Sequence, residues 1–176
     1  IERVKGFSRP TLEKNEVNVL GIVPENIPLR SPTVQEIYER VGGEILAGKE
    51  NLDNLVEDFL IGAMTPESAL TYFRRSVNKA VITGGDRSDI QLAALQTNTS
   101  ALILTGNLYP DVRVLARAEH QGVPVLLVPY DTYTTVSKTD EVTGRIKYSD
   151  EKKIKLAEKV VEEHVKWKEI LKLIGV

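Results

Sequence analysis

The sequence predicts an α/β protein built around a mainly parallel β-sheet. Two strand–loop–helix units follow one another between residues 80 and 118, and in each unit an apolar run ends in Thr-Gly, at Thr83-Gly84 and at Thr105-Gly106. A third unit of the same kind starts at residue 125. Successive strands of this kind run parallel and are joined by right-handed crossovers, so we expect both Thr-Gly loops at one edge of the sheet. Open α/β sheets bind their ligands at that edge.

The N-terminal part of the chain predicts a surface element, a strand and a loop. Residues 2–16 are polar and indicate a helical turn followed by a short helix. Residues 17–23 form a nearly continuous apolar run that ends at Pro24, which is typical of a buried strand. Residues 24–32 contain three prolines and are expected to form an ordered loop without regular structure.

The next elements lead into the regular part of the chain. Thr33 is a favourable N-cap for a short helix, which a glycine of the pair Gly42-Gly43 would end. Residues 44–47 predict a short strand. The apolar run within residues 55–64 fits a strand or a helix by periodicity, and we favour a strand. Thr65-Pro66 indicates the next helix, because proline is favoured at the first helical position.

The three regular units carry their own helix signals. Residues 88–91 fit a capping box at the start of the first helix. The second helix has Pro110 near its start and stops at Gly122. The third strand covers residues 125–128. The threonine-rich segment after it, residues 132–139, has low helix propensity and predicts only a short helix.

A long charged helix is expected at the C-terminus. After a polar turn at residues 144–148, Ser149 or Asp150 can cap a helix that runs to about Leu173 and has a wide apolar face. A helix of about 24 residues is about 36 Å long. A strand of roughly five or six residues needs less cover than that, so we expect the helix end to pack on a further surface, such as a second subunit.

The composition limits the partners and the environment of the protein. The 176 residues fit one domain, or one domain with an appendage, and the net charge of −2 gives no reason to expect nucleic acid or an anionic membrane as a partner. No apolar run approaches the roughly 18 residues of a membrane span, and there is no secretory signal, so we expect a cytoplasmic protein. The lack of cysteine excludes disulfides and thiolate metal sites. Frequent Glu and Lys with a single Met are typical of heat-adapted proteins.

The loop after the first Thr-Gly strand is the strongest candidate for a binding site. Gly84 and Gly85 allow a sharp turn and the close approach of a ligand, and the helix that follows presents free N–H groups. Arg87 can add a bidentate contact to phosphate or carboxylate, whereas Asp86 and Asp89 oppose an anion unless a cation or a hydroxyl group is also recognised. The loop lacks the spacing of a P-loop. The alternative is a structural turn in which Asp86 pairs with Arg87.

The loops after the next two strands extend this candidate site. Asn107 stands where the first loop has its second glycine, and asparagine tolerates a left-handed backbone, so the same turn geometry can persist. Asp131 and Thr132 suit sugar hydroxyls, or alternatively cap a helix. The candidate ligand-binding residues are Thr83, Gly84, Gly85, Asp86, Arg87, Thr105, Gly106, Asn107, Asp131 and Thr132.

The sequence gives no sign of catalysis or of a resident metal. It contains no nucleophile elbow, no HExxH and no recognisable Ser/His/Asp set. His120, near a helix end, and His164, in the long helix, have no partners at ligand spacing. We therefore expect no catalytic residue, no metal site and no cofactor in this chain.

Asp86-Arg87 and Thr105-Gly106 resemble the residues after which the DRTGG domain is named. The similarity continues through GDRSDIQLAAL, LILTG and GVPVLLVPYDTYTTV, covers about residues 47–140, and departs at Asn107, where the name implies a second glycine. The resemblance implies a three-layer α/β/α sandwich, similar to the N-terminal domains of HPr kinase and MurF. It also implies a regulatory or assembly module rather than an enzyme.

The segment before this module looks like the last strand and loop of a dethiobiotin synthetase-like P-loop domain, which commonly precedes DRTGG domains in phosphotransacetylase-family proteins. Three parts are then expected: a remnant of that domain at 1–35, the DRTGG domain at 36–148 and a C-terminal helix at 149–176. Because the chain starts at Ile1 rather than methionine, we expect it to be a piece of a longer polypeptide.

These observations favour a non-catalytic regulatory module that forms a homodimer and senses a small ligand such as a nucleotide. One alternative is the C-terminal part of an ATP-dependent enzyme, similar to dethiobiotin synthetase or cobyrinate synthase, whose P-loop half lies outside this sequence. A dimerisation scaffold without a ligand is a further alternative.

Overall fold

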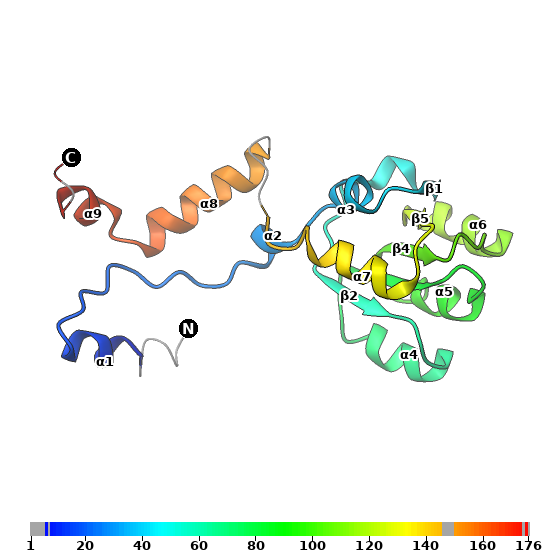
Figure 1. The fold of residues 1–176 in the computed structure, drawn as a ribbon, viewed down its shortest axis with the longest axis horizontal. Coiled ribbons are helices and arrows are strands. Elements are labelled where there is room, and N and C mark those ends of the chain that lie inside the picture. The colour runs from blue at the N-terminus through cyan, green and yellow to red at the C-terminus, as the bar shows by residue number, and fades with distance from the viewer. Residues whose placement is uncertain (1–5, 7, 146–149, 174, 176) are drawn as a thin grey trace. The chain divides into compact units, whose positions relative to one another are not determined.

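The computed structural model describes residues 6, 8–145, 150–173 and 175. The chain divides into two compact units (Figure 1). One unit is Arg30–Arg145, and the other is formed by the two ends of the chain, Ile1–Leu29 and Ile146–Val176. No helix in the described ranges is long and apolar enough to cross a membrane.

A five-stranded sheet, in the order β1-β5-β4-β3-β2, forms the centre of the unit Arg30–Arg145. Strands β2 to β5 run parallel, and β1 is antiparallel to β5. The mainly parallel sheet is thereby confirmed, and the ambiguous apolar run before residue 64 is a strand. The strands are β1 (Glu44–Ala47), β2 (Asp58–Ile61), β3 (Lys79–Gly84), β4 (Thr99–Thr105) and β5 (Val125–Leu127).

Helices cover both faces of this sheet, which confirms the three-layer α/β/α sandwich. One apolar cluster joins the sheet to α4, α5 and α6, and a second joins it to α3 and α7. The helices are α3 (Val34–Val41), α4 (Pro66–Phe73), α5 (Ser88–Ala94), α6 (Val112–Gln121) and α7 (Thr132–Asp140), with a short 3-10 turn, η2, at Lys49–Asn51.

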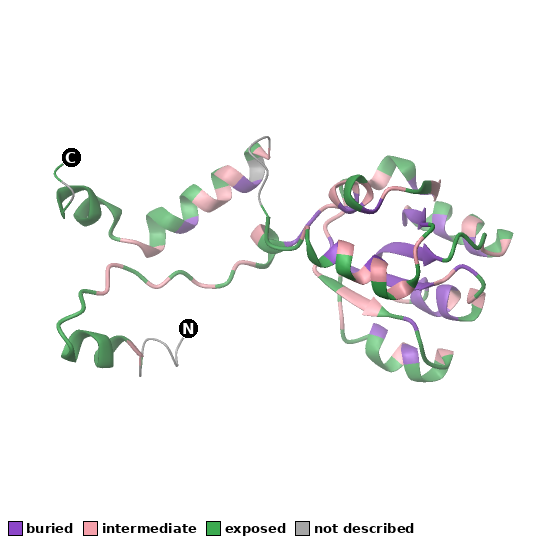
Figure 2. Ribbon diagram, viewed as in Figure 1, coloured by how far each residue is buried: buried purple, intermediate pink, exposed green. Residues whose placement is uncertain are grey.

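Strand β3 shows why the sequence has continuous apolar runs here. Successive side chains of a strand point to opposite faces, so Val81 enters the first cluster while Ala80 and Ile82 enter the second. All three side chains are fully buried. Figure 2 shows the buried residues concentrated on the central strands and on the helix faces that cover them. A strand covered on both faces has no solvent side and therefore no polar alternation.

The helix ends follow most of the sequence signals. Thr33 and Glu36 form a capping box at α3, and Gly122 ends α6 in a left-handed conformation. The capping box expected at residues 88–91 is wrong. Arg87 occupies the N-cap of α5 without a side-chain cap bond, because a guanidinium group has no hydrogen-bond acceptor, and the Gln91 amide donates instead to carbonyl oxygens of the preceding loop.

The unit formed by the chain ends departs further from the expectations. The predicted strand at residues 17–23 is wrong. Apart from one bridge at Gly21, this segment is not in a strand, because no sheet lies beside it among the described residues. The segment 24–32, expected to lack regular structure, contains the short helix α2 (Ile27–Arg30). The surface helix expected within residues 2–16 is present as α1 (Arg9–Lys14).

The long C-terminal helix is divided into α8 (Glu151–His164) and α9 (Trp167–Leu173). Asp150 caps α8 as expected, and its side chain accepts a hydrogen bond from the Lys153 N–H at 2.9 Å. The break occurs because the backbone at Val165 is extended and pairs with another segment of the chain. Ser149 and most of the polar turn expected at 144–148 lie outside the described residues.

Candidate functional site

The two Thr-Gly loops leave the sheet at the same edge, as the sequence predicts. Strands β3 and β4 are parallel neighbours, and Gly84 lies opposite Thr105. Thr83 lies opposite Leu104, so the two Thr-Gly dipeptides are offset by one residue in the sheet. The loops after β3, β4 and β5 therefore form one edge, at the carboxyl ends of the strands.

The loop after β3 is held by internal hydrogen bonds. The Thr83 hydroxyl donates to the Gly62 carbonyl oxygen at 2.9 Å. The fully buried amide of Gln91 donates through Nε2 to the carbonyl oxygens of Gly84, at 2.8 Å, and Gly85, at 3.0 Å. Sequence reasoning missed Gln91 as the residue that fixes this loop. Its position seven residues after Gly84, inside the helix that follows, was the available signal.

Gly85 is required by packing between loops. A Cβ atom at Gly85 would lie 1.6 Å from the Leu108 carbonyl oxygen, so any larger residue displaces the loop after β4. The Gly85 N–H donates to the Thr105 carbonyl oxygen at 3.3 Å. Gly85 thus allows the backbone of Leu108 to approach closely.

Arg87 is engaged in an ion pair within the loop. Its Nε and Nη2 atoms each lie 3.0 Å from a carboxylate oxygen of Asp89, and Nη2 also donates to the Met64 carbonyl oxygen at 2.9 Å. The hydrogen bonds from Arg87 lower the pKa of Asp89, and those bonds raise the pKa of Arg87 in turn. The alternative in which Asp86 pairs with Arg87 is therefore wrong, since the ion pair forms with Asp89 while Asp86 is exposed.

The loop after β4 has the predicted left-handed backbone. Gly106 has a φ of 80° and Asn107 a φ of 55°, so asparagine adopts the left-handed backbone as expected. The expectation that the loop after β3 shares this geometry is wrong, because neither Gly84 nor Gly85 has a positive φ. The N–H groups of Gly106 and Asn107 donate to the carbonyl oxygens of Tyr130, at 2.8 Å, and Val128, at 3.0 Å. These bonds tie the second loop to the third.

The loop after β5 combines a helix cap with a pair of hydroxyl groups. The Asp131 carboxylate accepts a hydrogen bond from the Thr134 N–H at 2.7 Å and so caps α7, which confirms the capping interpretation. The hydroxyl oxygens of Thr132 and Thr105 lie 3.2 Å apart. Thr105 is buried, whereas Thr132 is partly exposed and Asp131 is exposed. Thr132 therefore connects the buried end of β4 to the surface.

The connections that follow β4 and β5 lead to opposite faces of the sheet. The connections after β3 and β4 lead to α5 and α6 on one face, whereas the connection after β5 leads to α7 on the opposite face. Open α/β sheets bind ligands beside the carboxyl ends of neighbouring strands whose connections diverge in this way. The order of strands in the sheet decides this position, so the linear sequence did not reveal it.

Carboxylates outnumber cations at this edge. Arg87 is paired with Asp89, and Arg113 is paired with Asp111 at 2.8 Å. The hydrogen bonds from Arg113 lower the pKa of Asp111 to about 2. Within the described loops at this edge, Asp86 and Asp131 form no ion pair and leave the edge net negative. The charged side chains of these loops and of the helix starts that follow them are Asp86, Arg87, Asp89, Asp111, Arg113 and Asp131.

Neither histidine belongs to the loops at this edge. His120 is in the last turn of α6 and is exposed, and His164 ends α8 with its Nδ1 atom 3.0 Å from the Val160 carbonyl oxygen. Within the described part of the chain, no three acidic or histidine side chains are grouped so that they could hold a metal ion.

Comparison with known proteins identifies the central part of the chain. The sequence model of the DRTGG domain matches residues 36–142. A phosphate acetyltransferase of Nitratidesulfovibrio vulgaris is 34% identical over 154 residues, which cover 82% of this chain and 22% of that protein. A phosphate acetyltransferase of Synechocystis sp. is 30% identical over 146 residues, which cover 78% of this chain and 21% of that protein. The chain thus spans about a fifth of the length of these relatives.

A solved structure shares the fold. It contains the CBS and DRTGG domains of the regulatory region of Clostridium perfringens pyrophosphatase, complexed with the activator diadenosine tetraphosphate. The TM-score is 0.56 at 22% sequence identity, and the similarity covers 77% of this chain and 56% of that one. Because the DRTGG model matches more than half of its residues, this chain belongs to the DRTGG domain family.

Proposed function

We propose that this chain is a non-catalytic regulatory module that binds a nucleotide-like small molecule in a crevice between the carboxyl ends of β4 and β5. The observation that carries the proposal is the divergence of the connections after these strands, where the hydroxyls of Thr105 and Thr132 lie 3.2 Å apart. Asn107 and Asp131 flank this point and are exposed. The crevice therefore offers hydrogen-bonding groups from two diverging loops.

The relatives support a regulatory role. A DRTGG domain is part of the pyrophosphatase regulatory region that was solved with an adenine dinucleotide activator. The relatives named phosphate acetyltransferase are about five times longer than the matched segment. We propose that the module responds to its ligand and adjusts an acetyltransferase activity that resides outside this chain.

The chemistry of the crevice favours hydroxyl groups of the ligand over its phosphates. Asp131 uses one carboxylate oxygen to cap α7, and its second oxygen is available to accept a hydrogen bond from a sugar hydroxyl. Arg87 would have to release Asp89 before it could bind a phosphate in bidentate fashion. A nucleoside moiety in the crevice, with its phosphates directed toward solvent, fits this distribution of charge.

A ligand panel tests this proposal. Diadenosine tetraphosphate, ATP, ADP and adenosine are added to the chain, and unfolding is followed by circular dichroism. A ligand at 100 times its Kd is expected to stabilise the fold by about 2.7 kcal/mol. Thr105→Val is expected to weaken binding about fivefold, since one hydroxyl contact is worth about 1 kcal/mol.

The control is Thr99→Val, at the opposite end of the same strand, where the hydroxyl donates to the Ala94 carbonyl oxygen at 2.8 Å. It should leave binding unchanged. The absence of a shift with every compound, or equal binding by Thr105→Val and the unaltered chain, would refute the proposed site.

We also propose that the module forms a homodimer through the unit Arg30–Arg145. Strand β2 is at the end of the sheet, and the side chain of Ile61 on it is 46% exposed, so a second copy can pair there. Light scattering of the chain with and without the residues after Ser149 tests this. A dimer is expected in both cases, whereas a monomer in both contradicts it.

The assignment of residues 1–35 to a P-loop-like domain is a further proposal, and it leads to the second candidate function, part of an ATP-dependent enzyme. The apolar run at residues 17–23, which lacks a neighbouring sheet in the described structure, favours this candidate. ATP hydrolysis by the full natural polypeptide that contains this sequence would support it. The absence of a Gly-Lys-Ser/Thr loop from that polypeptide would eliminate it.

A further inference from the structure

The segments that precede and follow the DRTGG domain contact each other through their backbones. Gly21 and Val165 form an antiparallel bridge, and the Lys166 N–H donates to the Leu20 carbonyl oxygen at 2.7 Å. A Cβ atom at Gly21 would lie 2.5 Å from the His164 carbonyl oxygen, so the contact requires glycine there. The two flanks are thus parts of one structural unit, although the whole DRTGG domain separates them in the sequence.

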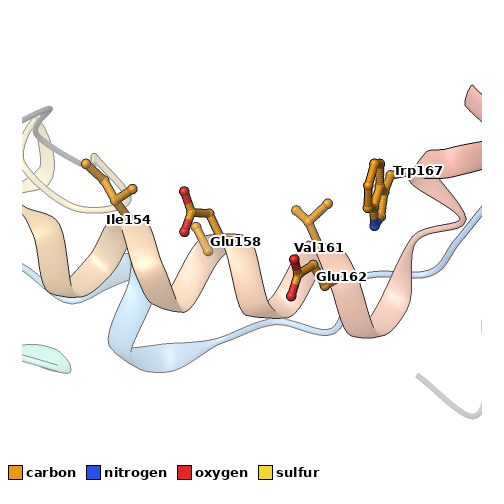
Figure 3. Close-up of a pocket in the computed structure, with 6 residues that line it drawn as sticks. Ile154, Glu158, Val161, Glu162 and Trp167 are labelled. Carbon is orange, nitrogen blue, oxygen red and sulfur yellow. The ribbon is translucent and has the colours of Figure 1, made fainter. Parts of the chain in front are cut away.

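An apolar groove lies along α8 in this unit. Figure 3 shows side chains of α8 and Trp167 arranged along the helix, with two carboxylates among them. The cavity has a volume of about 610 Å³ and is open to solvent. Val161 is 42% and Trp167 38% exposed. The groove is lined by Ile154, Ala157, Glu158, Val161, Glu162 and Trp167.

This unit lacks a core of its own. Among its described residues, Val160 is the one apolar side chain that is buried. In the apolar run at residues 17–23, Val17 is 47% and Val23 52% exposed. A unit as small as this one cannot form a stable fold unless it buries more of its apolar surface. Both the groove and the extended segment therefore require a covering surface.

The charge of the groove and the length of the related proteins indicate which surface covers it. Two α8 helices packed antiparallel along this groove would bring the Glu158 and Glu162 carboxylates of one copy against those of the other, and like charges destabilise such a pair. The alignment with the Nitratidesulfovibrio relative covers 154 residues, which is more than the segment 36–142 that matches the DRTGG domain. The similarity therefore includes residues that flank the domain, and the relative itself is much longer than this chain.

We infer that the DRTGG domain is inserted into another domain of the same polypeptide, and that the α8 groove is the surface on which the remainder of that domain packs. The groove fits an apolar face bordered by lysine or arginine, because Glu158 and Glu162 line it. The extended segment at 17–23 adds to the sheet of the same domain. This inference is independent of the ligand site proposed above.

Hydrogen exchange measured by mass spectrometry tests the inference. The chain is compared with the full natural polypeptide that contains it. Peptides covering residues 17–23 and 154–167 are expected to exchange at least about tenfold more slowly in the longer protein. Peptides from β3 and β4 serve as the internal reference, because these strands are already buried in this chain.

Two variants of the longer protein make the test specific. Val161→Glu should abolish the added protection of residues 154–167. Val112→Glu, the same substitution at a 75% exposed position in the unit Arg30–Arg145, should leave it intact. Equal exchange of the groove in both proteins would overturn the inference. Protection that appears in this chain alone as its concentration rises would also overturn it, because the cover would then be a second copy.

Discussion

At the scale of single residues, Lys79 is a buried cation at the amino end of β3. Its side chain is fully buried, and its ammonium group donates to the carbonyl oxygens of Ser76, at 3.2 Å, and of Asn98. The group also lies 5.9 Å from the centroid of the Phe73 ring. Burial lowers the pKa of Lys79 from 10.5 to about 8, although the nearby Asp58 carboxylate opposes this shift.

This burial makes the stability of the protein depend on pH in a specific direction. Between pH 8 and 10.5 the unfolded chain binds a proton that the folded chain does not, so the free energy of unfolding should rise with pH. The free energy of unfolding should rise by about 3 kcal/mol in total across this range. Below pH 8 the buried Lys79 is charged in the folded chain, and the free energy of unfolding is lowered by this full amount. Urea unfolding across this range measures it, and Lys79→Met should remove it.

Lys138→Met is the matched control for this prediction. Lys138 is only partly buried, and its ammonium group lies 4.7 Å from the centroid of the Tyr130 ring. Its replacement should preserve the rise in stability with pH. An identical pH dependence in Lys79→Met and the unaltered chain would show that another group titrates.

Gly85 is a second residue whose surroundings determine its identity. Gly85→Ala should lower the free energy of unfolding by about 2 kcal/mol, because the new Cβ would overlap the Leu108 carbonyl oxygen and separate the loops after β3 and β4. Gly6→Ala, at a position with no atom within 4 Å of the new Cβ, should change stability by less than about 0.5 kcal/mol. Urea denaturation compares the two, and similar small losses would contradict the packing account.

At the scale of elements, the helix starts differ in how their caps are built. Thr33 accepts a hydrogen bond from the Glu36 N–H at 3.1 Å, and the Glu36 carboxylate accepts one from the Thr33 N–H at 2.9 Å. Thr65 holds the same position at α4, yet its side chain makes no cap bond. A threonine at the start of a predicted helix therefore does not by itself indicate whether its side chain forms a cap hydrogen bond.

This difference predicts unequal effects of the same substitution. Thr33→Ala should destabilise the protein by about 1 kcal/mol, because the N–H group of Glu36 loses its acceptor. Thr65→Ala should lower the free energy of unfolding by less than half of that amount, because Thr65 forms no cap bond. Thermal unfolding of both variants measures the difference, and an equal loss in stability would mean that the cap bond is not the cause.

At the scale of the whole molecule, nearly all of the buried apolar residues belong to one unit. In the described structure, Val160 is the one buried apolar residue outside Arg30–Arg145. A fragment of residues 30–145 should therefore unfold cooperatively, with a free energy of unfolding within about 1 kcal/mol of that of the whole chain. Urea unfolding followed by circular dichroism tests this. A broad, non-cooperative transition of the fragment would contradict it.

The accuracy of the sequence-based predictions depends on whether an element buries its apolar residues within this chain. The strands β3, β4 and β5 and the Gly122 helix end were predictable, because local propensity and burial agree there. Residues 17–23 have an equally apolar pattern, but the sheet that such a pattern needs is not among the described residues. The same reason explains the break of the C-terminal helix at Val165, where a backbone pairing replaces the helical hydrogen bonds.

By itself, the sequence determined the parallel α/β architecture, the common edge of the Thr-Gly loops and the left-handed turn at Asn107. These features depend on residue periodicity and on local backbone preference, which neighbouring residues fix. Only the tertiary structure decided that Arg87 pairs with Asp89, that Gln91 holds the first loop and that the connections diverge between β4 and β5. The contacts of Arg87 and Gln91 depend on how side chains are directed within the folded loop, and the divergence of the connections depends on the packing of helices on the two faces of the sheet. Periodicity carries no information about either.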